Sequence, residues 1–295
     1  MTMSKSLDRY MHHRGVPVPT FIYGTAWKED RSEALTRLAL ATGFRGIDTA
    51  NQRRHYDEAG VGAAIGRVLS AGELKREELF LQSKFTYAVA QDHRLPYDPA
   101  ADFTRQVVQS VESTLTHLHT DHLDAYLLHG PLQPYILSRA DWEVWRAMEA
   151  LQREGKIRLL GISNVQPGQL DLLLDGAAVK PAFVQNRCFA RTGWDAEVRA
   201  RCTAHDIVYQ GFSLLTANAR ELNSPKVEQI ARSHNCSSAR VIFRFAQQMG
   251  MIPLTGTTRQ VHMQEDLGCY EIDLNAAELA MLANIAAPAN SLGRP

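Results

Sequence analysis

Polar and ionisable side chains end several short apolar runs of this sequence, and their types are those of acid–base chemistry. Asp48 ends the run from Arg45, Lys84 ends the run from Leu79, and His129 ends the run from Asp124. Three further runs end in groups that donate or accept hydrogen bonds, namely Ser163 with Asn164, Gln185, and Ser213 after Phe212. Six such ends are more than burial alone would tolerate, so we predict one convergent polar site.

An aspartate, a lysine and a histidine that meet in such a site can control the proton of a neighbouring acid. The carboxylate of Asp48 would hold the ammonium of Lys84, and the ammonium would lower the pKa of the acid beside it. Tyr56 follows the second run and is the acid within reach; a free tyrosine has a pKa of about 10. Taken singly, each residue has a structural interpretation of equal weight. Asp48 could cap a turn, Lys84 could be a surface charge, and His129 could be a histidine whose hydrogen bonds only support the fold. Their coincidence in order and position favours a site.

Eight apolar runs alternate with segments of helical period from one end of the chain to the other. Residues 103–118 show the helical period, with apolar side chains spaced four, four, four and three apart. Strands that alternate with helices pair in parallel through right-handed crossovers. No GxGxxG follows the first run, as an open dinucleotide-binding sheet would usually show. The pattern therefore predicts an α/β fold, a (β/α)8 TIM barrel. The runs are Phe21–Ala26, Arg45–Thr49, Leu79–Phe85, Asp124–His129, Leu159–Ser163, Ala182–Gln185, Ile207–Phe212 and Met251–Leu254.

The chain shows no linker or shift in composition along its length. We therefore predict that residues 1–295 form a single barrel domain with short N- and C-terminal extensions. Because the active site of such barrels lies at the C-terminal ends of the strands, the polar run ends should share one rim. The longest predicted loop lies between Thr86 and Ala101, and loops of that length are often functional.

Composition excludes several classes of protein. Apolar residues make up 45% of the chain, and 32 basic residues balance 32 acidic ones, so the excess positive charge of a nucleic-acid binder is missing. No apolar stretch is long enough for a signal sequence or a membrane span. Four cysteines without CxxC spacing, and histidines at 117, 119 and 122 without further ligands, predict no metal site. We expect a cytoplasmic protein with a small-molecule partner and no nucleic-acid or membrane partner. A monomer is favoured, although the sequence leaves the oligomeric state open.

Three motifs resemble those of the aldo-keto reductases. Gly43–Ala50, continued by Tyr56, Glu58, Val61 and Gly62, is similar to the first signature of that family. Lys156–Val165 resembles the second, and Ile252-Pro253 followed by Thr255-Gly256-Thr257 lies where the third is expected. The resemblance runs from about Phe21 to Ala286. It implies an enzyme that uses NADPH to reduce small aldehydes or ketones reversibly to alcohols.

The resemblance also implies roles for individual residues. Asp48, Tyr56, Lys84 and His129 would form a catalytic tetrad in which Tyr56 protonates the carbonyl oxygen, Lys84 and Asp48 tune its pKa, and His129 orients the carbonyl or shares the proton. Ser163, Asn164 and Gln185 would hold the carboxamide of the cofactor, and Phe212 would lie against its nicotinamide ring. The remaining part of the cofactor would contact Ser213, Leu214, Thr255, Gly256, Thr257, Arg259 and Glu265. Trp27, His55 and Phe85 would line the substrate pocket.

The sequence departs from the family pattern around the proton donor. Tyr56 lies eight residues after Asp48, where five is usual, and two before Glu58, where three is usual; His55 takes the three-before position. An insertion in the stretch of residues 51–54 would explain the longer spacing from Asp48, and a phenol next to a lysine suits proton donation better than an imidazole. We therefore assign the role to Tyr56 and keep His55 as the alternative.

Cofactor preference and function also have alternatives. Family members that prefer NADPH carry a lysine and an arginine after the last strand, whereas Leu254 stands at the lysine position and His262 near the arginine position. We expect NADPH with weak discrimination, so that NADH use is possible. A nucleotide-binding regulatory subunit of the same fold, or an aldolase that forms a Schiff base on Lys84, are the alternative functions.

Overall fold

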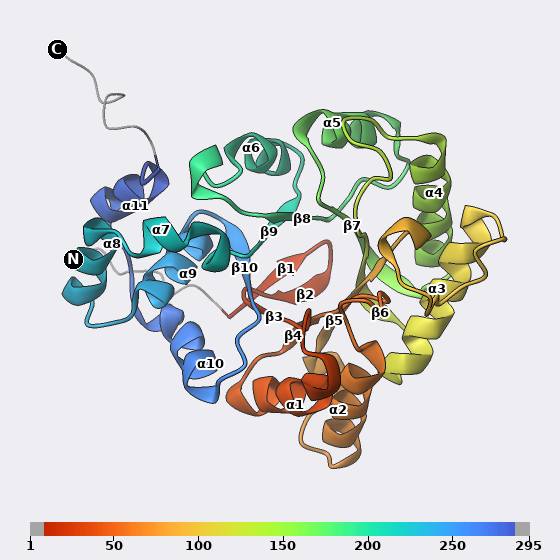
Figure 1. Cartoon of the computed structure of the whole chain (residues 1–295), viewed down its shortest axis with the longest axis horizontal. Coiled ribbons are helices and arrows are strands. Elements are labelled where there is room, and N and C mark those ends of the chain that lie inside the picture. Colours follow the sequence, from red (N-terminus) through yellow and green to blue (C-terminus); the bar gives the residue numbers. More distant parts are fainter. Residues whose placement is uncertain (1–8, 287–295) are drawn as a thin grey trace.

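Eight parallel strands close into a barrel in the computed structural model, which describes residues 9–286 (Figure 1). Each of the eight apolar runs forms one barrel strand, and the last strand pairs with the first to close the sheet. The predicted (β/α)8 barrel is therefore confirmed. In barrel order the strands are β3 (Ile22–Gly24), β4 (Gly46–Asp48), β5 (Phe80–Phe85), β6 (Leu123–Leu128), β7 (Ile157–Ser163), β8 (Phe183–Arg187), β9 (Val208–Phe212) and β10 (Met251–Thr255).

Helices surround the barrel and bury the outer face of its strands, which is why the strands read as apolar runs rather than as alternating patterns (Figure 1). None of the helices between residues 9 and 286 is long and apolar enough to cross a membrane. The helices are α1 (Ser32–Thr42), α2 (Glu58–Ser70), α3 (Phe103–Leu118), α4 (Arg139–Arg153), α5 (Pro167–Gly176), α6 (Ala196–Ala204), α7 (Ala219–Leu222), α8 (Pro225–Ser233), α9 (Ser238–Gln248), α10 (Gln260–Leu267) and α11 (Ala276–Ala283).

Local sequence explains where these helices begin and end. The Asp102 side chain accepts a hydrogen bond from the backbone N–H of Arg105 and caps α3, whose apolar stripe packs against the barrel. The helix ends at His119, which adopts a left-handed conformation. Ser224 caps α8 in the same way, and Pro225 occupies its first turn.

A hairpin that the sequence did not reveal covers the N-terminal end of the barrel. Strands β1 (Tyr10–His13) and β2 (Val16–Pro19) pair through a two-residue turn, Arg14-Gly15, in which both residues have positive φ. Figure 1 shows the hairpin within the ring of strands. Val18 is fully buried there and belongs to the apolar cluster that fills the barrel interior. The N-terminal extension thus closes the end of the barrel opposite to the strand ends that carry the polar residues.

Glycine at position 62 allows α2 to approach the end of α3. A Cβ atom at Gly62 would lie 1.7 Å from the carbonyl oxygen of His117, so no larger residue fits without moving the helix. The approach buries Glu58 in the first turn of α2, where its carboxylate accepts a hydrogen bond from Ser83 Oγ at 2.5 Å. Since Tyr56 lies just before α2, this packing sets the position of the predicted proton donor.

Candidate active site

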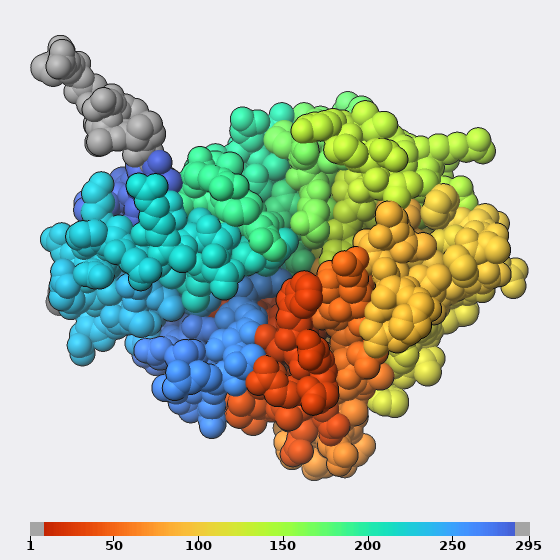
Figure 2. All heavy atoms as spheres, in the orientation of Figure 1, coloured from red at the N-terminus to blue at the C-terminus, as the bar shows by residue number. Residues whose placement is uncertain are grey.

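A cavity of about 780 Å³ opens at the C-terminal ends of the barrel strands. Figure 2 shows this face hollowed where the red and orange N-terminal segments meet the cyan and blue C-terminal ones. The residues lining the cavity come from the ends of six barrel strands, from the loops that follow them and from helices α9 and α10. Its wall includes most of the predicted site residues, namely Trp27, Asp48, His55, Tyr56, His129, Ser163, Asn164, Gln185, Phe212, Ser213, Leu214, Thr255, Gly256, Thr257 and Glu265.

Three predicted site residues do not border the cavity. Phe85 is fully buried among the helices, where its ring packs 5.6 Å from that of Tyr97, so its assignment to the substrate pocket is wrong. Successive side chains of a strand point to opposite faces, so Phe85 points outwards because Lys84 points inwards. Arg259 precedes α10 with an exposed side chain and does not reach the wall. Lys84 is fully buried and does not border the cavity.

Lys84 and Asp48 form a buried ion pair. The ammonium lies 2.6 and 2.7 Å from the two carboxylate oxygens of Asp48, and it donates a third hydrogen bond to the carbonyl oxygen of Thr49 at 2.9 Å. All three N–H groups of Lys84 are therefore used, and both side chains are almost completely buried. Direct contact with Asp48 balances much of the Lys84 charge, so Lys84 can lower the pKa of a neighbour less than an unpaired cation would.

Tyr56 lies between this ion pair and His129. Its ring is 5.5 Å from the Lys84 ammonium and 6.0 Å from the His129 ring. Within residues 9–286 the hydroxyl makes no hydrogen bond, and the residue borders the cavity. Burial and the Asp48 carboxylate raise the pKa of Tyr56, so the prediction of a net lowering by Lys84 is wrong. The reason is that desolvation favours the neutral phenol and that Lys84 is already paired.

His129 is held on three sides. Its backbone N–H donates to Phe85, its carbonyl oxygen accepts from Asn164 Nδ2 at 2.8 Å, and its Nδ1 lies 2.7 Å from Thr86 Oγ. Burial and the Lys84 cation lower the pKa of His129 to about 3, so the ring is neutral. The Thr86 hydroxyl is buried and contacts no other acceptor in the described chain. Its proton therefore belongs on the bond to Nδ1, which leaves Nε2 of His129 as an N–H donor.

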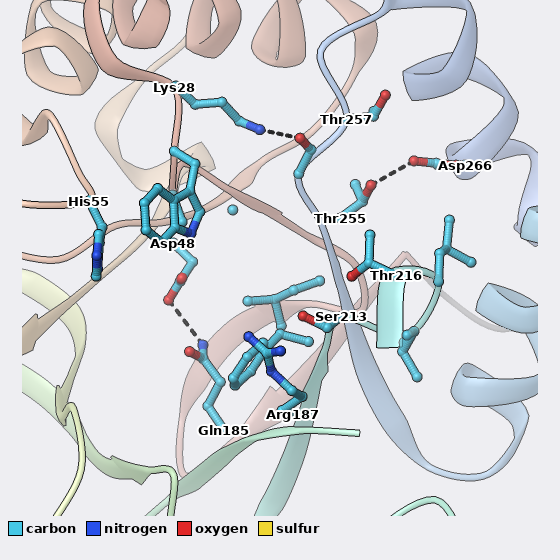
Figure 3. A pocket seen from close by; sticks show the side chains of 18 of the residues that line it. Lys28, Asp48, His55, Gln185, Arg187, Ser213, Thr216, Thr255, Thr257 and Asp266 are labelled. Carbon is cyan, nitrogen blue, oxygen red and sulfur yellow. Dashed lines mark hydrogen bonds between the residues drawn. The ribbon is translucent and has the colours of Figure 1, made fainter. Parts of the chain in front are cut away.

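A layer of buried amides connects Asp48 with the opposite side of the barrel. Gln82 Nε2 donates to Asp48 and to Gln210, and Gln185 Nε2 donates to the same two acceptors at 3.0 and 2.9 Å. Figure 3 shows the Asp48–Gln185 contact at the cavity wall. Because both acceptors hold Nε2, the amide oxygen of Gln185 is left without a partner in residues 9–286. The Oδ1 atom of Asn164 likewise makes no hydrogen bond there.

His55 and Tyr56 lie at different places in the site. The His55 ring packs against Trp27 with a centroid distance of 3.9 Å, whereas the Tyr56 ring lies beside the Lys84 ammonium. Of the two candidates for proton donor, only Tyr56 contacts both the ion pair and His129.

The wall also contains charged residues that the sequence patterns did not indicate. Lys28 donates to the carbonyl oxygen of Gly256, and burial lowers its pKa to about 8. Asp266 accepts a hydrogen bond from Thr255 Oγ at 2.8 Å, and burial raises its pKa to about 7 (Figure 3). Arg187 lies 5.6 Å from the Phe212 ring and has no ion-pair partner among the described residues. Arg187 stands two residues after Gln185, so strand alternation could have identified it.

The free groups of the cavity fit a nicotinamide dinucleotide. The oxygens of Asn164 and Gln185 can accept the N–H groups of a carboxamide, and the Phe212 ring stands nearby on the cavity wall. After β9, Ser213 adopts a positive φ of 58°, and the N–H groups of Leu214 and Leu215 make no hydrogen bond in the described chain. Such N–H groups suit a phosphate oxygen, and Lys28 adds a cation on the same wall.

Comparisons with known proteins agree on one family. The sequence profile described as the aldo/keto reductase family matches residues 20–287. An uncharacterized oxidoreductase of Bacillus subtilis, YtbE, is 30% identical over 269 residues, which cover 90% of this chain and 89% of the relative. The glyoxal reductase of the same organism is 29% identical, with 92% and 90% covered. The crystal structure of a Bombyx mori aldo-keto reductase in complex with NADP has the same fold, with a TM-score of 0.80 at 22% identity and 94% and 92% covered.

Proposed function

The chain belongs to the aldo/keto reductase family and is an NAD(P)H-dependent oxidoreductase, and from this premise we propose that it reduces small aldehydes or ketones reversibly to alcohols with Tyr56 as the proton donor. One observation carries the proposal. The Tyr56 hydroxyl reaches the cavity without a protein hydrogen bond among the described residues, next to a buried cation and a neutral histidine. A carbonyl oxygen that accepts from this hydroxyl would find its proton source already in place.

Tyr56 suits the role of general acid because its proton is retained until charge develops on the substrate. Burial and Asp48 raise its pKa, so the phenol is neutral at physiological pH. When the substrate oxygen becomes negative, the phenol can give up its proton. The phenolate that remains faces the Lys84 ammonium 5.5 Å away, and attraction between opposite charges in a buried site stabilises it. A cation that stabilises the phenolate also opposes the rise in the pKa of Tyr56, so Lys84 would offset part of the effect of burial and Asp48 without reversing it.

His129 would orient the carbonyl without supplying the proton. A ring with a pKa of about 3 is neutral under all ordinary conditions, and Thr86 directs its remaining N–H to Nε2. This N–H can donate a second hydrogen bond to the substrate oxygen. Two fixed donors define one position for that oxygen.

The cofactor would lie against the opposite wall. Asn164 and Gln185 would hold the carboxamide and Phe212 would pack against the ring, which fixes its orientation. Backbone N–H groups of Leu214 and Leu215, with Lys28, would hold the phosphates. When bound, the reduced nicotinamide supplies the hydride. Of the other residues assigned to the cofactor, Ser213, Thr255, Gly256, Thr257 and Glu265 border the cavity.

We assign NADPH as the preferred cofactor, with weak discrimination against NADH. Leu254 and His262 both border the cavity at the positions where the family pattern has a lysine and an arginine. A neutral imidazole and an apolar side chain hold a phosphate less well than two fixed cations. The NADP in the Bombyx mori structure supports this class of cofactor. Competition between NADPH and NADH in fluorescence titrations measures the preference.

An aldolase reaction through Lys84 has no support in the geometry. A Schiff base requires a free amine at the cavity, whereas Lys84 does not border the cavity and has all three N–H groups bound to Asp48 and Thr49. Nothing in the site favours the alternative of a regulatory subunit, which would bind nucleotide without turnover.

The proposal is tested by comparing Tyr56→Phe with the unchanged enzyme on a panel of aldehydes and ketones. We expect kcat to fall by a factor of about 10² to 10⁴ while NADPH affinity is kept, since only the proton donor is removed. Tyr135→Phe is the matched control, because Tyr135 is 74% exposed and does not border the cavity. Normal turnover by Tyr56→Phe would contradict the assignment. Tight NADPH binding without any carbonyl reduction by the unchanged chain would contradict the enzyme activity itself.

A further inference from the structure

His55 and Trp27 pack against each other on one wall of the cavity. Their ring centroids lie 3.9 Å apart with the rings tilted by 37°, and the backbone N–H of Trp27 donates to the carbonyl oxygen of His55 at 2.7 Å. Figure 3 shows His55 on the wall across the cavity from Ser213 and Thr216. Trp27 is 66% exposed, so the pair lies at the edge of the cavity, where a substrate enters.

Neighbouring groups determine which nitrogen of His55 carries the proton. Gln52 Nε2 lies 2.7 Å from the carbonyl oxygen of Ala90, and because a carbonyl only accepts, the side-chain amide can adopt only this orientation. The amide oxygen of Gln52 therefore faces His55 Nδ1, 3.0 Å away. An oxygen that only accepts requires N–H at that position, so Nδ1 carries the proton. Burial and Arg54 lower the pKa of His55, which favours the neutral ring.

The remaining nitrogen, Nε2, is an unprotonated acceptor. This nitrogen makes no hydrogen bond in the described chain. It is also not fully buried, and because His55 borders the cavity, we infer that a ligand in the cavity can reach it. The cavity therefore contains two histidines of opposite character. His129 presents an N–H to the proposed carbonyl position, whereas His55 presents a lone pair beside Trp27.

We propose that His55 Nε2 accepts a hydrogen bond from a hydroxyl group of the substrate, so that the enzyme prefers hydroxylated aldehydes and ketones over their deoxy counterparts. The inference rests on the proposed function, because it assumes carbonyl reduction in this cavity. A hydroxyl is the donor that fits. A carboxylate has no proton to give, and an ammonium would bring a further cation into a cavity that Lys28 and Arg187 already line. Binding the deoxy compound leaves the desolvated nitrogen without a donor, which is the basis of discrimination.

The experiment compares kcat/KM for matched pairs, hydroxyacetone with acetone and glyceraldehyde with propanal. For each pair, the ratio of hydroxylated to deoxy compound is measured in the unchanged enzyme and in His55→Phe. Phenylalanine keeps a ring against Trp27 but has no acceptor. We expect the ratio to fall about 5- to 10-fold in this variant, as the loss of one hydrogen bond predicts. The matched control is His205→Phe, an exposed histidine at the end of α6 that does not border the cavity and should leave the ratio unchanged.

Equal ratios in the unchanged enzyme and in His55→Phe would overturn the inference while carbonyl reduction itself stands. If neither compound of a pair is reduced by the unchanged enzyme, the proposed function fails instead. A second measurement does not depend on a variant that folds. Long-range ¹⁵N–¹H spectra of the unchanged protein should show the proton of His55 on Nδ1, and a proton on Nε2 would directly contradict its role as an acceptor.

Discussion

Replacing Lys84 by methionine separates the contribution of its charge to stability from its contribution to proton transfer. Methionine keeps an unbranched chain of similar volume and removes the ammonium, which leaves the Asp48 carboxylate buried with only the amides of Gln82 and Gln185 as donors. Breaking one side of a buried ion pair costs about 3–5 kcal/mol. The entropy of unfolding is about 2.1 cal/mol/K per residue, or roughly 0.6 kcal/mol/K for this chain, so Tm should fall by about 5–8 °C.

The double variant Lys84→Met with Asp48→Asn removes both charges. The oxygen of the new amide can still accept from Gln82 and Gln185, so the free energy of unfolding should return to within about 1–2 kcal/mol of that of the unchanged protein. Turnover should not return, because no cation then faces the phenolate of Tyr56. Calorimetry gives the stabilities, and single-turnover reduction gives the rate of the chemical step.

Two results would refute this reasoning. If Lys84→Met leaves Tm unchanged, the Lys84–Asp48 ion pair does not contribute the expected 3–5 kcal/mol, roughly, to the free energy of unfolding. If the double variant regains both stability and turnover, the Lys84 charge plays no part in proton transfer, and its role is confined to holding Asp48.

Three further predictions concern the other polar contacts of the site. Thr86→Val should lower kcat about 10-fold with little change in KM, and Thr86→Ser should restore it, because the hydroxyl directs the His129 proton to Nε2; steady-state kinetics of both variants measure this. Burial holds the pKa of Lys28 near 8, and a bound phosphate should raise it again, so NADPH binding above pH 8 should take up a proton and weaken as pH rises. Calorimetric titration in buffers of different ionisation heat detects that proton, and Lys28→Met should abolish it. Asp266 has its pKa raised to about 7 by burial, so the native chain binds its proton more tightly than the unfolded chain, and stability is lost as pH rises from about 4 through 7. Asp266→Asn should therefore raise Tm at pH 8 but hardly at pH 4, and an equal effect at both would contradict the assignment.

The strand ends could be predicted from the sequence because burial imposes a strong pattern. Barrel strands are covered by helices outside and by side chains inside, so any polar residue within or after an apolar run needs a partner or a function. Asp48, Lys84 and His129 stand out by this criterion, and the structure brings them together around Tyr56. The outward orientation of Phe85 also follows from the sequence, since strand alternation places it opposite to Lys84.

The hydrogen bonds between loops that orient the site residues could not be predicted from the sequence, because no periodic pattern marks them. Gln52 meets Ala90 across 38 positions of sequence, and Thr86 meets His129 across 43. The hairpin β1–β2 also escaped prediction, because its four-residue strands are too short for a clear period. The long loop after Thr86 does not border the cavity, but its Ala90 carbonyl orients the amide that holds His55.

The sequence by itself determined the barrel, the rim that carries the chemistry and the types of residue on it, because apolar periodicity and strand order are local properties of the chain. Only the tertiary structure decided the states of those residues. Whether Lys84 is paired, whether Tyr56 holds its proton, and which nitrogen of each histidine carries hydrogen depend on burial and on hydrogen-bond partners, most of them tens of residues away. Desolvation and hydrogen bonding act over a few ångströms, and the spacing of residues along the chain does not specify which groups become neighbours at that distance in the fold.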